Sequence, residues 1–263
     1  MAQPHKYRLY ELAVQSPEVH AAWFDRMFQD VRAFPATSFC EDFCGTFALS
    51  CAWIQMRPVN RALGIDLDPE PLAYGQRVHA KALTVQQRKR LDIRQADVLK
   101  RDLPKSDIVC ACNFSFCIFK DRALLIRYMS AVRKRLTRNG IFIMEAAGGP
   151  GMIESLKERK TLELRDGSKC RYIWDQKSFD PITHDALYAI HFRLPDGSMM
   201  QDAFTYDWRL WTIPELRDCL LETGFRQVTV YWERQEKGKG TGEYVPMTAG
   251  DNAHAWVAYI VAF

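Results

Sequence analysis

The stretch that decides the fold of this 263-residue chain is Ser38 to Leu49, which reads SFCEDFCGTFAL. A short apolar run ends at the acidic pair Glu41-Asp42, and a second apolar run begins at Phe47. Gly45 lies in the turn between them, where a residue without a side chain lets a ligand approach the backbone. The stretch therefore predicts a strand, a tight turn and a helix.

A second stretch, Arg61 to Pro69 (RALGIDLDP), follows about twenty residues later. It predicts a strand that ends at Asp66 and a helix with Asp68 as N-cap and Pro69 in its first turn. Strand, glycine turn, helix, strand and acid is the order in which an open α/β sheet builds a nucleoside pocket, because the second acid accepts hydrogen bonds from ribose hydroxyls.

The same alternation continues to residue 145, after two helices over 6–14 and 17–32. It implies a mostly parallel sheet, whose strands are apolar on both faces because helices cover both. The predicted strands of this sheet lie near 37–41, 61–66, 91–95, 106–112 and 140–146.

Beyond residue 150 the apolar pattern changes to two-fold alternation, which is typical of antiparallel strands. It predicts three strands, with a hairpin turn at Pro195–Ser198 between the last two. A helix starting at Thr212, a strand, a polar glycine-rich loop over Glu236–Gly250 and a closing strand complete the chain. The three predicted strands cover 169–177, 185–194 and 199–208.

Taken together, these motifs resemble the class I S-adenosylmethionine-dependent methyltransferases that act on small molecules. Their first turn usually reads acid-x-Gly-x-Gly-x-Gly; here Glu41 takes the acidic position, Gly45 is retained, and Phe43 and Phe47 replace the outer glycines. The resemblance implies an α/β, Rossmann-like, seven-stranded, mostly parallel sheet with helices on both faces. It divides the chain into an N-terminal helical lid (1–35), a core (36–150 and 208–263) and an antiparallel β insertion after strand five (151–207).

The implied cofactor is S-adenosylmethionine, with S-adenosylhomocysteine as product. Asp66 would bind the ribose, Asp97 the adenine amine and Glu41 the region of the ligand's amino group. Asp42 competes with Glu41 for that role, or caps the following helix. The full set of implied cofactor-binding residues is Glu41, Gly45, Thr46, Asp66, Leu67, Asp97, Val98, Asn113 and Phe114.

Methyl transfer from a sulfonium is an in-line displacement, so the protein must align the nucleophile, exclude water and provide a route for a proton. We expect the acceptor to be an amine or a hydroxyl, with Glu145 as general base or amine anchor and Tyr206 as a second catalytic residue. In the predicted acceptor site, Trp174 and Trp208 of the insertion would hold an amine by cation–π contact, and Tyr7 and Tyr10 of the lid would touch the ligand. Plain packing is the competing interpretation for all four.

The composition is that of an ordinary globular protein, with 48% hydrophobic and 26% charged residues and a net charge of +4. No apolar run is long enough to span a bilayer, which predicts no membrane partner. The eight cysteines are scattered and form no ligand set, so we expect no metal and a cytoplasmic location.

Two other functions remain open from the sequence. One is a non-catalytic protein that binds S-adenosylmethionine or another nucleoside. The other is a methyltransferase of RNA or protein, for which the basic residues between Arg88 and Arg101 are the motivation. Without aromatic residues among them, nucleic acid is disfavoured and a small-molecule substrate is preferred. The sequence leaves homodimerisation open.

Overall fold

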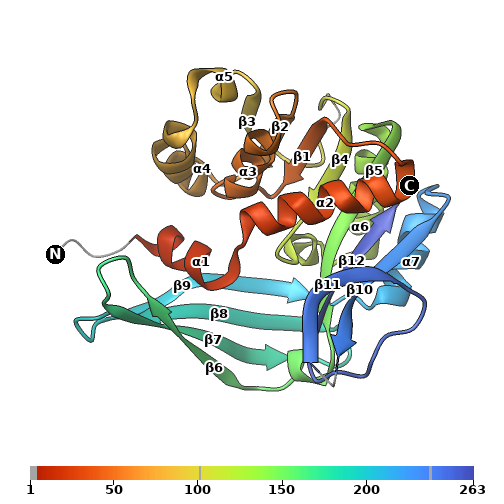
Figure 1. Ribbon diagram of the computed structural model, residues 1–263. Helices are drawn as coiled ribbons and strands as arrows, with labels where there is room; N and C mark the ends of the chain where they lie inside the picture. The colour runs from red at the N-terminus through yellow and green to blue at the C-terminus, as the bar shows by residue number, and fades with distance from the viewer. Residues whose placement is uncertain (1–4, 101, 237–238) are drawn as a thin grey trace.

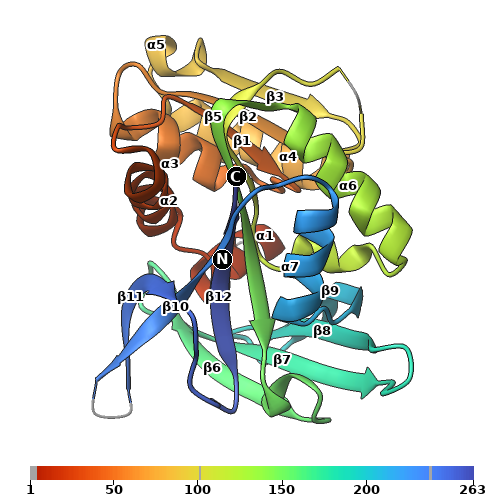
Figure 2. The same ribbon diagram turned by 90° about the vertical axis from the view of Figure 1, so that its right-hand side faces the viewer.

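The computed structural model of the chain describes residues 5–100, 102–236 and 239–263. Arg101, the last member of the predicted basic cluster, and the first four residues of the predicted lid lie outside them. The ribbon has an α/β layer above a separate β-sheet, with α1 between the two (Figure 1). Seen from the side, β5 and β12 extend from the upper layer down to the lower sheet (Figure 2).

Helices and strands alternate through the first half of the chain, as the sequence predicts. The α-helices are α1 (Lys6–Val14), α2 (Pro17–Arg32), α3 (Ala48–Met56), α4 (Pro69–Gly75), α5 (Val85–Arg88), α6 (Arg122–Lys134) and α7 (Ile213–Glu222). The strands are β1 (Ser38–Asp42), β2 (Arg61–Asp66), β3 (Leu91–Gln95), β4 (Ser106–Ala111), β5 (Leu136–Gly148), β6 (Lys157–Glu163), β7 (Lys169–Phe179), β8 (Asp185–Arg193), β9 (Met199–Arg209), β10 (Val228–Glu236), β11 (Lys239–Met247) and β12 (Trp256–Ala262).

The main sheet has the strand order β11-β10-β12-β5-β4-β1-β2-β3. Strands β1 to β5 are parallel, and β12, β10 and β11 are antiparallel to their neighbours, so the predicted fold class is confirmed. The predicted count of seven strands is wrong, because β11 adds an eighth. The loop predicted over Glu236–Gly250 contains this edge strand, which the prediction missed because its glycines are typical of a loop. A Cβ on Gly240 would lie 2.3 Å from Glu233 Oε1, so any other residue there would displace the end of this side chain.

The inserted sheet lies between β5 and α7 in the sequence and is antiparallel, in the order β6-β7-β8-β9. The three predicted strands are present, and the Pro195–Ser198 turn joins the last two through the Leu194 N–H to Ser198 C=O bond of 2.9 Å. The prediction missed β6. This edge strand buries only Leu162, so its sequence shows no alternation of apolar and polar residues.

Helices cover both faces of the main sheet, and each face has its own buried core. On one face, α2 and α3 bury Phe24, Phe28 and Trp53 against the sheet. On the other face, α6 and α7 contribute Leu125, Tyr128, Leu216 and Leu220 to a core that also includes Tyr188 and Trp208 of the inserted sheet. The inserted sheet is therefore packed onto the α/β layer.

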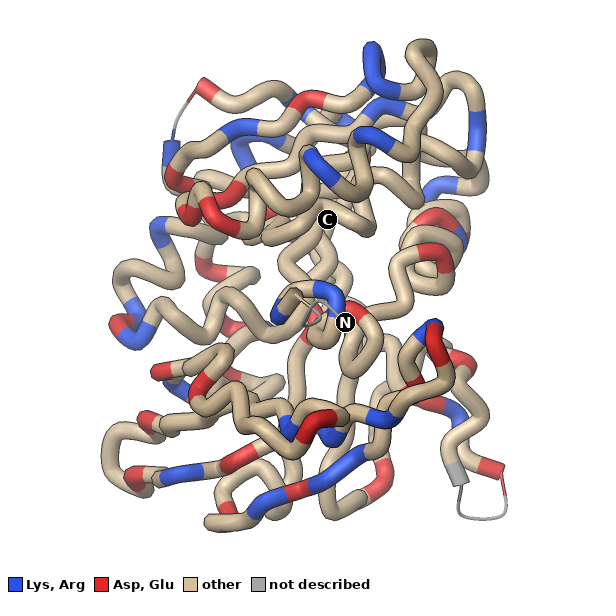
Figure 3. Tube along the Cα trace, turned by 90° about the vertical axis from the view of Figure 1, so that its left-hand side faces the viewer, with Lys and Arg blue, Asp and Glu red and all other residues tan. Residues whose placement is uncertain are grey.

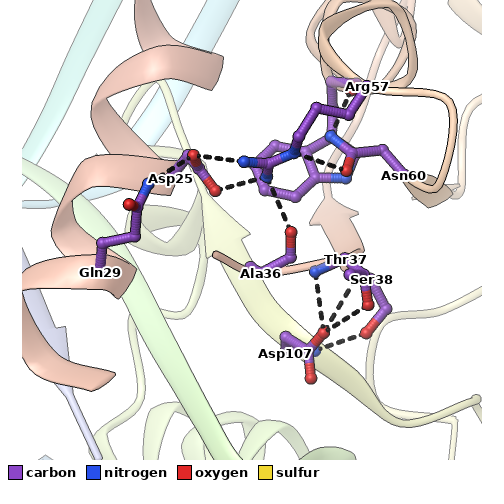
Figure 4. A network of polar contacts seen from close by, with 9 residues as sticks. Asp25, Gln29, Ala36, Thr37, Ser38, Arg57, Asn60 and Asp107 are labelled. Carbon is purple, nitrogen blue, oxygen red and sulfur yellow. Dashed lines mark hydrogen bonds and ion pairs between the residues drawn. The ribbon is translucent and has the colours of Figure 1, made fainter. Parts of the chain in front are cut away.

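Polar contacts fix α2 and α3 at the amino ends of the parallel strands (Figure 4). Arg57, after α3, donates to both carboxylate oxygens of Asp25 on α2, at 2.8 and 2.6 Å, and to the Ala36 carbonyl at 2.8 Å. Asp107 accepts hydrogen bonds from the backbone N–H groups of Thr37 and Ser38. With this edge occupied by structural contacts, the opposite edge, at the carboxyl ends of the strands, is free to form a site.

Candidate active site

Two adjoining cavities lie at the carboxyl ends of β1, β2 and β4. The first, which we call the loop cavity, has a volume of about 240 Å³ and is lined by the Gly45 turn, Asp66 and side chains of the lid. The second, the aromatic cavity, has a volume of about 400 Å³ and is lined largely by the inserted sheet and β10 to β12. Tyr10, Asn113 and Tyr206 line both and mark the boundary between them.

The turn that forms the floor of the loop cavity has an unusual backbone. Phe43, Gly45 and Phe47 all have positive φ angles, of 55°, 51° and 49°. Phenylalanine rarely adopts this left-handed conformation, which glycine reaches freely. The turn therefore holds two phenylalanines in a backbone conformation that glycine adopts more readily.

Contacts of the two phenylalanine rings stabilise this turn without filling the cavity. Phe47 is fully buried, packs beside Gly75 and does not line the loop cavity. Phe43 does line it, but its ring packs against Phe119 and Tyr128, with centroids 5.9 and 5.7 Å apart. The rings therefore leave the space above Gly45 open.

Asp66 connects the turn to the next strand. Its Oδ2 accepts a hydrogen bond from the Gly45 N–H at 2.7 Å, and its Oδ1 accepts one from the Asp68 N–H at 2.9 Å. Burial raises the pKa of Asp66, while these backbone hydrogen bonds act against the rise. Asp68 caps α4 by accepting from the Glu70 N–H, as predicted. One carboxylate thus fixes the turn and faces the cavity.

Glu41 lies deeper, at the end of β1. It is 6% exposed, and its Oε2 accepts from the Ser50 N–H at 2.9 Å and from the Ser50 hydroxyl at 2.6 Å. Burial raises the pKa of Glu41 to about 8, against the effect of the Ser50 hydrogen bonds. At neutral pH this carboxyl is mainly protonated, until a positive charge in the cavity favours its ionised form.

Asp42 does not perform either of the roles predicted for it. Its side chain points away from the loop cavity and forms a buried ion pair with Arg135, with a further hydrogen bond of 2.8 Å from the Tyr128 hydroxyl. Successive residues of a strand face opposite sides of the sheet, so Glu41 and Asp42 cannot serve the same cavity.

The lid is attached to the turn by side-chain contacts. Glu11 on α1 accepts a hydrogen bond of 2.6 Å from the Thr46 hydroxyl and lies 2.7 Å from His79 Nε2. Lys6 forms an ion pair of 2.8 Å with Glu70 on α4. These contacts hold Tyr7 and Tyr10 over the loop cavity, which both residues line.

The end of β4 forms the wall between the cavities. Asn113 and Phe114 have positive φ angles of 51° and 57°, and the Asn113 N–H donates to Glu145 Oε2 at 2.5 Å. The other oxygen of Glu145 accepts from the Tyr259 hydroxyl at 3.4 Å. Glu145 thus fixes the backbone of Asn113 from outside both cavities.

The aromatic cavity contains a cluster of stacked and tilted rings. The Tyr206 and Trp208 centroids are 4.5 Å apart, and Trp174 lies 5.9 Å from Tyr206. Two carboxylates, Glu158 and Glu233, also line the cavity, whereas none of its described lining residues is a lysine, arginine or histidine. Rings and carboxylates without a counter-cation form an environment that favours a positively charged group.

Tyr10 and Tyr206 meet where the two cavities join, and their hydroxyl groups interact. Burial raises the pKa of Tyr10 to about 12, and burial together with Tyr10 raises the pKa of Tyr206 well above its ordinary value. Both phenols therefore keep their protons at neutral pH and act as hydrogen-bond donors there.

The structure brings most of the predicted site residues to these cavities. The loop cavity is lined by Tyr7, Tyr10, Glu41, Gly45, Thr46, Asp66, Asn113 and Tyr206, and the aromatic cavity by Tyr10, Asn113, Phe114, Trp174, Tyr206 and Trp208. Four predicted residues line neither: Leu67, Asp97, Val98 and Glu145.

These four residues differ in their surroundings. Val98 is buried in the core, and Asp97 accepts from the Leu99 N–H at 2.8 Å in a turn after β3. Leu67 is 68% exposed at the tip of β2, which is unusual for a leucine in so ordered a region. Leu67 and Asp97 follow the neighbouring parallel strands β2 and β3, on the same edge of the sheet as Asp66.

Several lining residues are not evident from the sequence. Gln15 reads as part of a helix boundary, and Glu158 lies in the strand that the prediction missed. Glu233, Tyr244 and Trp256 come from β10, β11 and β12, which follow β5 only after the inserted sheet and α7. Only the antiparallel pairing of β12 with β5 brings them beside Asn113, and no local pattern signals that pairing.

Some of the basic residues between Arg88 and Arg101 make hydrogen bonds and ion pairs within the fold. Arg90 donates to the carbonyls of Ile54 and Arg57 at the end of α3, and Arg94 pairs with Asp92. Basic and acidic segments are mixed over both layers of the molecule (Figure 3). Two arginines of the cluster therefore make contacts within the fold.

The described residues contain neither a metal-ligand group nor a membrane-spanning helix. They contain no group of three or more His, Cys, Asp or Glu side chains arranged to hold a metal ion. No helix among them has both the length and the apolar character that crossing a membrane requires.

Comparison with solved structures identifies the fold. The chain is similar to a sugar N-methyltransferase, KedS8, from a Streptoalloteichus species (TM-score 0.69, 18% identity, 100% of this chain and 93% of that one). It is also similar to CalS10, an amino pentose methyltransferase from Micromonospora echinaspora with bound S-adenosylmethionine (TM-score 0.69, 15% identity, 98% of each chain).

A third similar structure is an S-adenosylmethionine-dependent methyltransferase from Clostridium acetobutylicum (TM-score 0.69, 13% identity, 97% of this chain and 96% of that one). No protein-family model matches the sequence, and the search of curated proteins gave no significant match. The chain therefore has the fold of the S-adenosylmethionine-dependent methyltransferases over its whole length, including the inserted sheet.

Proposed function

We propose that this protein transfers a methyl group from S-adenosylmethionine to the nitrogen of a small cationic amine. The observation that carries the proposal is the pair of adjoining cavities, one with carboxylates at successive strand ends and one with aromatic rings and two further carboxylates. The similarity in fold to a sugar N-methyltransferase and an amino pentose methyltransferase supports it.

The residues of the loop cavity suit the cofactor. Asp66 has lone pairs to spare for the ribose hydroxyls after accepting two backbone hydrogen bonds, and the Glu41 carboxyl suits the α-ammonium group. At about 240 Å³ the cavity is smaller than the roughly 300–1,000 Å³ usual for ligand sites, so it fits the ribose and methionine parts. The adenine would then lie at the rim, against exposed Leu67 and within reach of Asp97.

When bound, the cofactor supplies a sulfonium methyl group. Asn113, Tyr10 and Tyr206 surround the junction through which the acceptor nitrogen must reach that carbon. The acceptor must attack as a neutral amine, so Glu158 or Glu233, which line the aromatic cavity, would first accept a proton from its ammonium form. The lone pair so freed would form the C–N bond as the electrons of the C–S bond go to sulfur. The chain's contribution is alignment and exclusion of water by the aromatic walls, which is the main requirement of an in-line displacement.

Glu158 and Glu233 support an amine rather than a hydroxyl acceptor. A neutral hydroxyl gains little from two carboxylates, whereas an ammonium group is attracted by both and by the π-faces of Trp174 and Trp208. Glu233 keeps one oxygen free while its Oε1 accepts from the Gly242 N–H at 2.8 Å.

Calorimetry with S-adenosylhomocysteine and a radiolabelled methyl-transfer assay test this function. We expect micromolar binding of S-adenosylhomocysteine and transfer to members of an amine panel, including amino sugars, but not to matched alcohols. Absence of binding at millimolar ligand would reject the function. Binding without transfer to any amine, phenol or alcohol would favour a non-catalytic nucleoside-binding protein.

The raised pKa of Glu41, about 8, predicts that cofactor binding releases a proton. Below pH 8 the Glu41 carboxyl of the free protein is mainly protonated. An α-ammonium group bound beside this carboxyl lowers the pKa of Glu41, so the carboxyl releases its proton. The affinity for S-adenosylhomocysteine should therefore rise with pH between about 6 and 8, by at most about tenfold per pH unit. Calorimetry at pH 7 in two buffers of different ionisation enthalpy measures the released proton.

Glu41→Gln should remove this proton release, and Glu18→Gln, at an exposed position in the first turn of α2, should leave it intact. Equal proton release from wild type and Glu41→Gln would show that another group titrates.

Tyr206→Phe should reduce turnover by about 10- to 100-fold while the affinity for S-adenosylhomocysteine changes less than about twofold. The hydroxyl keeps its proton at neutral pH, and its loss removes a hydrogen-bond donor at the junction where the acceptor aligns. Steady-state kinetics with an active amine, together with calorimetry, separate the two effects. Tyr172→Phe, which removes a hydroxyl from the aromatic cavity alone, is the control, and an equal loss there would contradict the role of Tyr206.

A further inference from the structure

The side chain of Gln15 has an unsatisfied carbonyl group in the candidate site. Among the described residues, four buried side-chain polar atoms have no hydrogen-bond partner: Gln15 Oε1, Trp53 Nε1, Arg135 Nε and Arg209 Nε. Of these four residues, only Gln15 lines the loop cavity, and none of the others lines the aromatic cavity. Buried polar atoms in native proteins nearly always have partners, so an orphaned acceptor in a cavity wall indicates a missing donor.

The fold holds Gln15 in place in two ways. It is the C-cap residue of α1, and its own backbone N–H donates to the Glu11 carbonyl at 3.1 Å. The side chain of the same Glu11 accepts from the Thr46 hydroxyl of the turn. Pro17, two residues on, starts α2 and prevents α1 from continuing. Gln15 is therefore a fixed part of the cavity wall.

The neighbours of Gln15 show which part of a ligand it would meet. Besides the loop cavity, it lines a shallower hollow together with Ala48, the first residue of α3. Asp66, which suits the ribose, lines the same cavity from β2, whereas Gln15 caps the helix whose Glu11 accepts from the Thr46 hydroxyl, just before α3. It is therefore associated with the methionine side of the cavity.

We infer that the Gln15 carbonyl oxygen accepts a hydrogen bond from the α-ammonium group of the cofactor's methionine part. This inference rests on the proposed function. An amide oxygen only accepts hydrogen bonds, and of the cofactor's donors the ribose hydroxyls and the adenine amine lie toward Asp66 and the rim. The α-ammonium is the remaining donor, and a hydrogen bond to a charged group is stronger than a neutral one.

The inference also explains how the site works with two of its three motif glycines absent. A Cβ at position 43, which lines the loop cavity, restricts how closely a ligand can approach the backbone of the turn. Acceptors on side chains, Glu41 from β1 and Gln15 from the lid, then bind the methionine end in place of the backbone. The lid in this protein is thus part of the cofactor site as well as its cover.

Two probes that differ only in the methionine part test the inference by calorimetry. S-adenosylhomocysteine carries the α-ammonium, and 5′-methylthioadenosine lacks the whole amino-acid group. Gln15→Leu should weaken binding of S-adenosylhomocysteine by about tenfold or more and change binding of 5′-methylthioadenosine less than about twofold. Gln15→Glu, which keeps an acceptor and adds a negative charge, should bind S-adenosylhomocysteine at least as tightly as wild type.

Gln86→Leu makes the same substitution at an exposed position of α5 and is the matched control. Equal losses for both probes in Gln15→Leu, or no loss for either, would overturn the inference while leaving the proposed function intact. If wild type bound neither probe, the proposed function would fail first and the inference with it. If Gln15→Leu folds poorly, Gln15→Glu is used instead, once a melting curve has shown that it is natively folded. Weaker binding of S-adenosylhomocysteine by that variant than by wild type would then overturn the inference.

Discussion

Asp66→Ala is expected to weaken binding of S-adenosylhomocysteine by about 10²- to 10⁴-fold, the largest effect of any single change at the site. In the proposed complex the carboxylate makes two hydrogen bonds to the ribose, each worth roughly 1.5–3 kcal/mol for a charged acceptor. It also fixes the turn through the Gly45 N–H at 2.7 Å, so the alanine variant loses both the ligand contact and the order of the turn.

Calorimetry on the alanine and asparagine variants measures this effect. Asp66→Asn keeps an oxygen that can accept from Gly45 and should fall between the alanine variant and wild type. Asp92→Ala, at an exposed acid on neighbouring β3, should bind as wild type does. Binding by a natively folded Asp66→Ala within threefold of wild type would show that the ribose lies elsewhere.

Arg135→Met should lower the free energy of unfolding by about 3–5 kcal/mol, the range for breaking a buried ion pair from one side. The side chains of Arg135 and Asp42 are 3% and 0% exposed. Removal of the guanidinium leaves the Asp42 carboxylate in the core with only the Tyr128 hydroxyl as a side-chain partner of full strength. The carboxylate then carries an uncompensated charge in surroundings that water does not reach.

Urea denaturation of three variants tests this effect. The double variant Asp42→Leu/Arg135→Met should recover part of the loss, because it removes both charges and restores apolar contact. Asp92→Ala breaks an exposed pair with Arg94 and should cost less than about 1 kcal/mol. If Arg135→Met unfolded at the same urea concentration as wild type, the pair would contribute nothing to stability.

Sequence patterns predict the parallel half of the sheet well, because each element there has a local signal. The helix caps at Asp68 and Thr212 are confirmed by hydrogen bonds to the first turns of α4 and α7. The edge strands β6 and β11 were missed because they have no such local signal. Strand β6 buries only Leu162 and so has no apolar alternation, and the glycines of β11 read as a loop.

The residues of the candidate site also fall into those that the sequence predicts and those that it does not. Glu41, Gly45 and Asp66 are predictable because each follows or precedes a strand at a fixed spacing, and parallel strands bring their carboxyl ends to one edge. Glu145 was predicted at the end of its strand, but β5 continues to Gly148, and the left-handed backbone at Asn113 directs the Asn113 N–H onto the Glu145 carboxylate. Glu145 therefore lines neither cavity. No spacing rule foresees such a contact.

The sequence by itself therefore determined the class of fold, the succession of parallel strands along the chain and the acids at their tips, since these follow from local periodicity and spacing. Only the tertiary structure decided which residues meet across the cavities: Gln15 from the lid, Glu158 from the inserted sheet, and Glu233 from β10. The physical reason is that long-range antiparallel pairing and the packing of the lid depend on buried surfaces far apart in the chain, whose match no local pattern encodes.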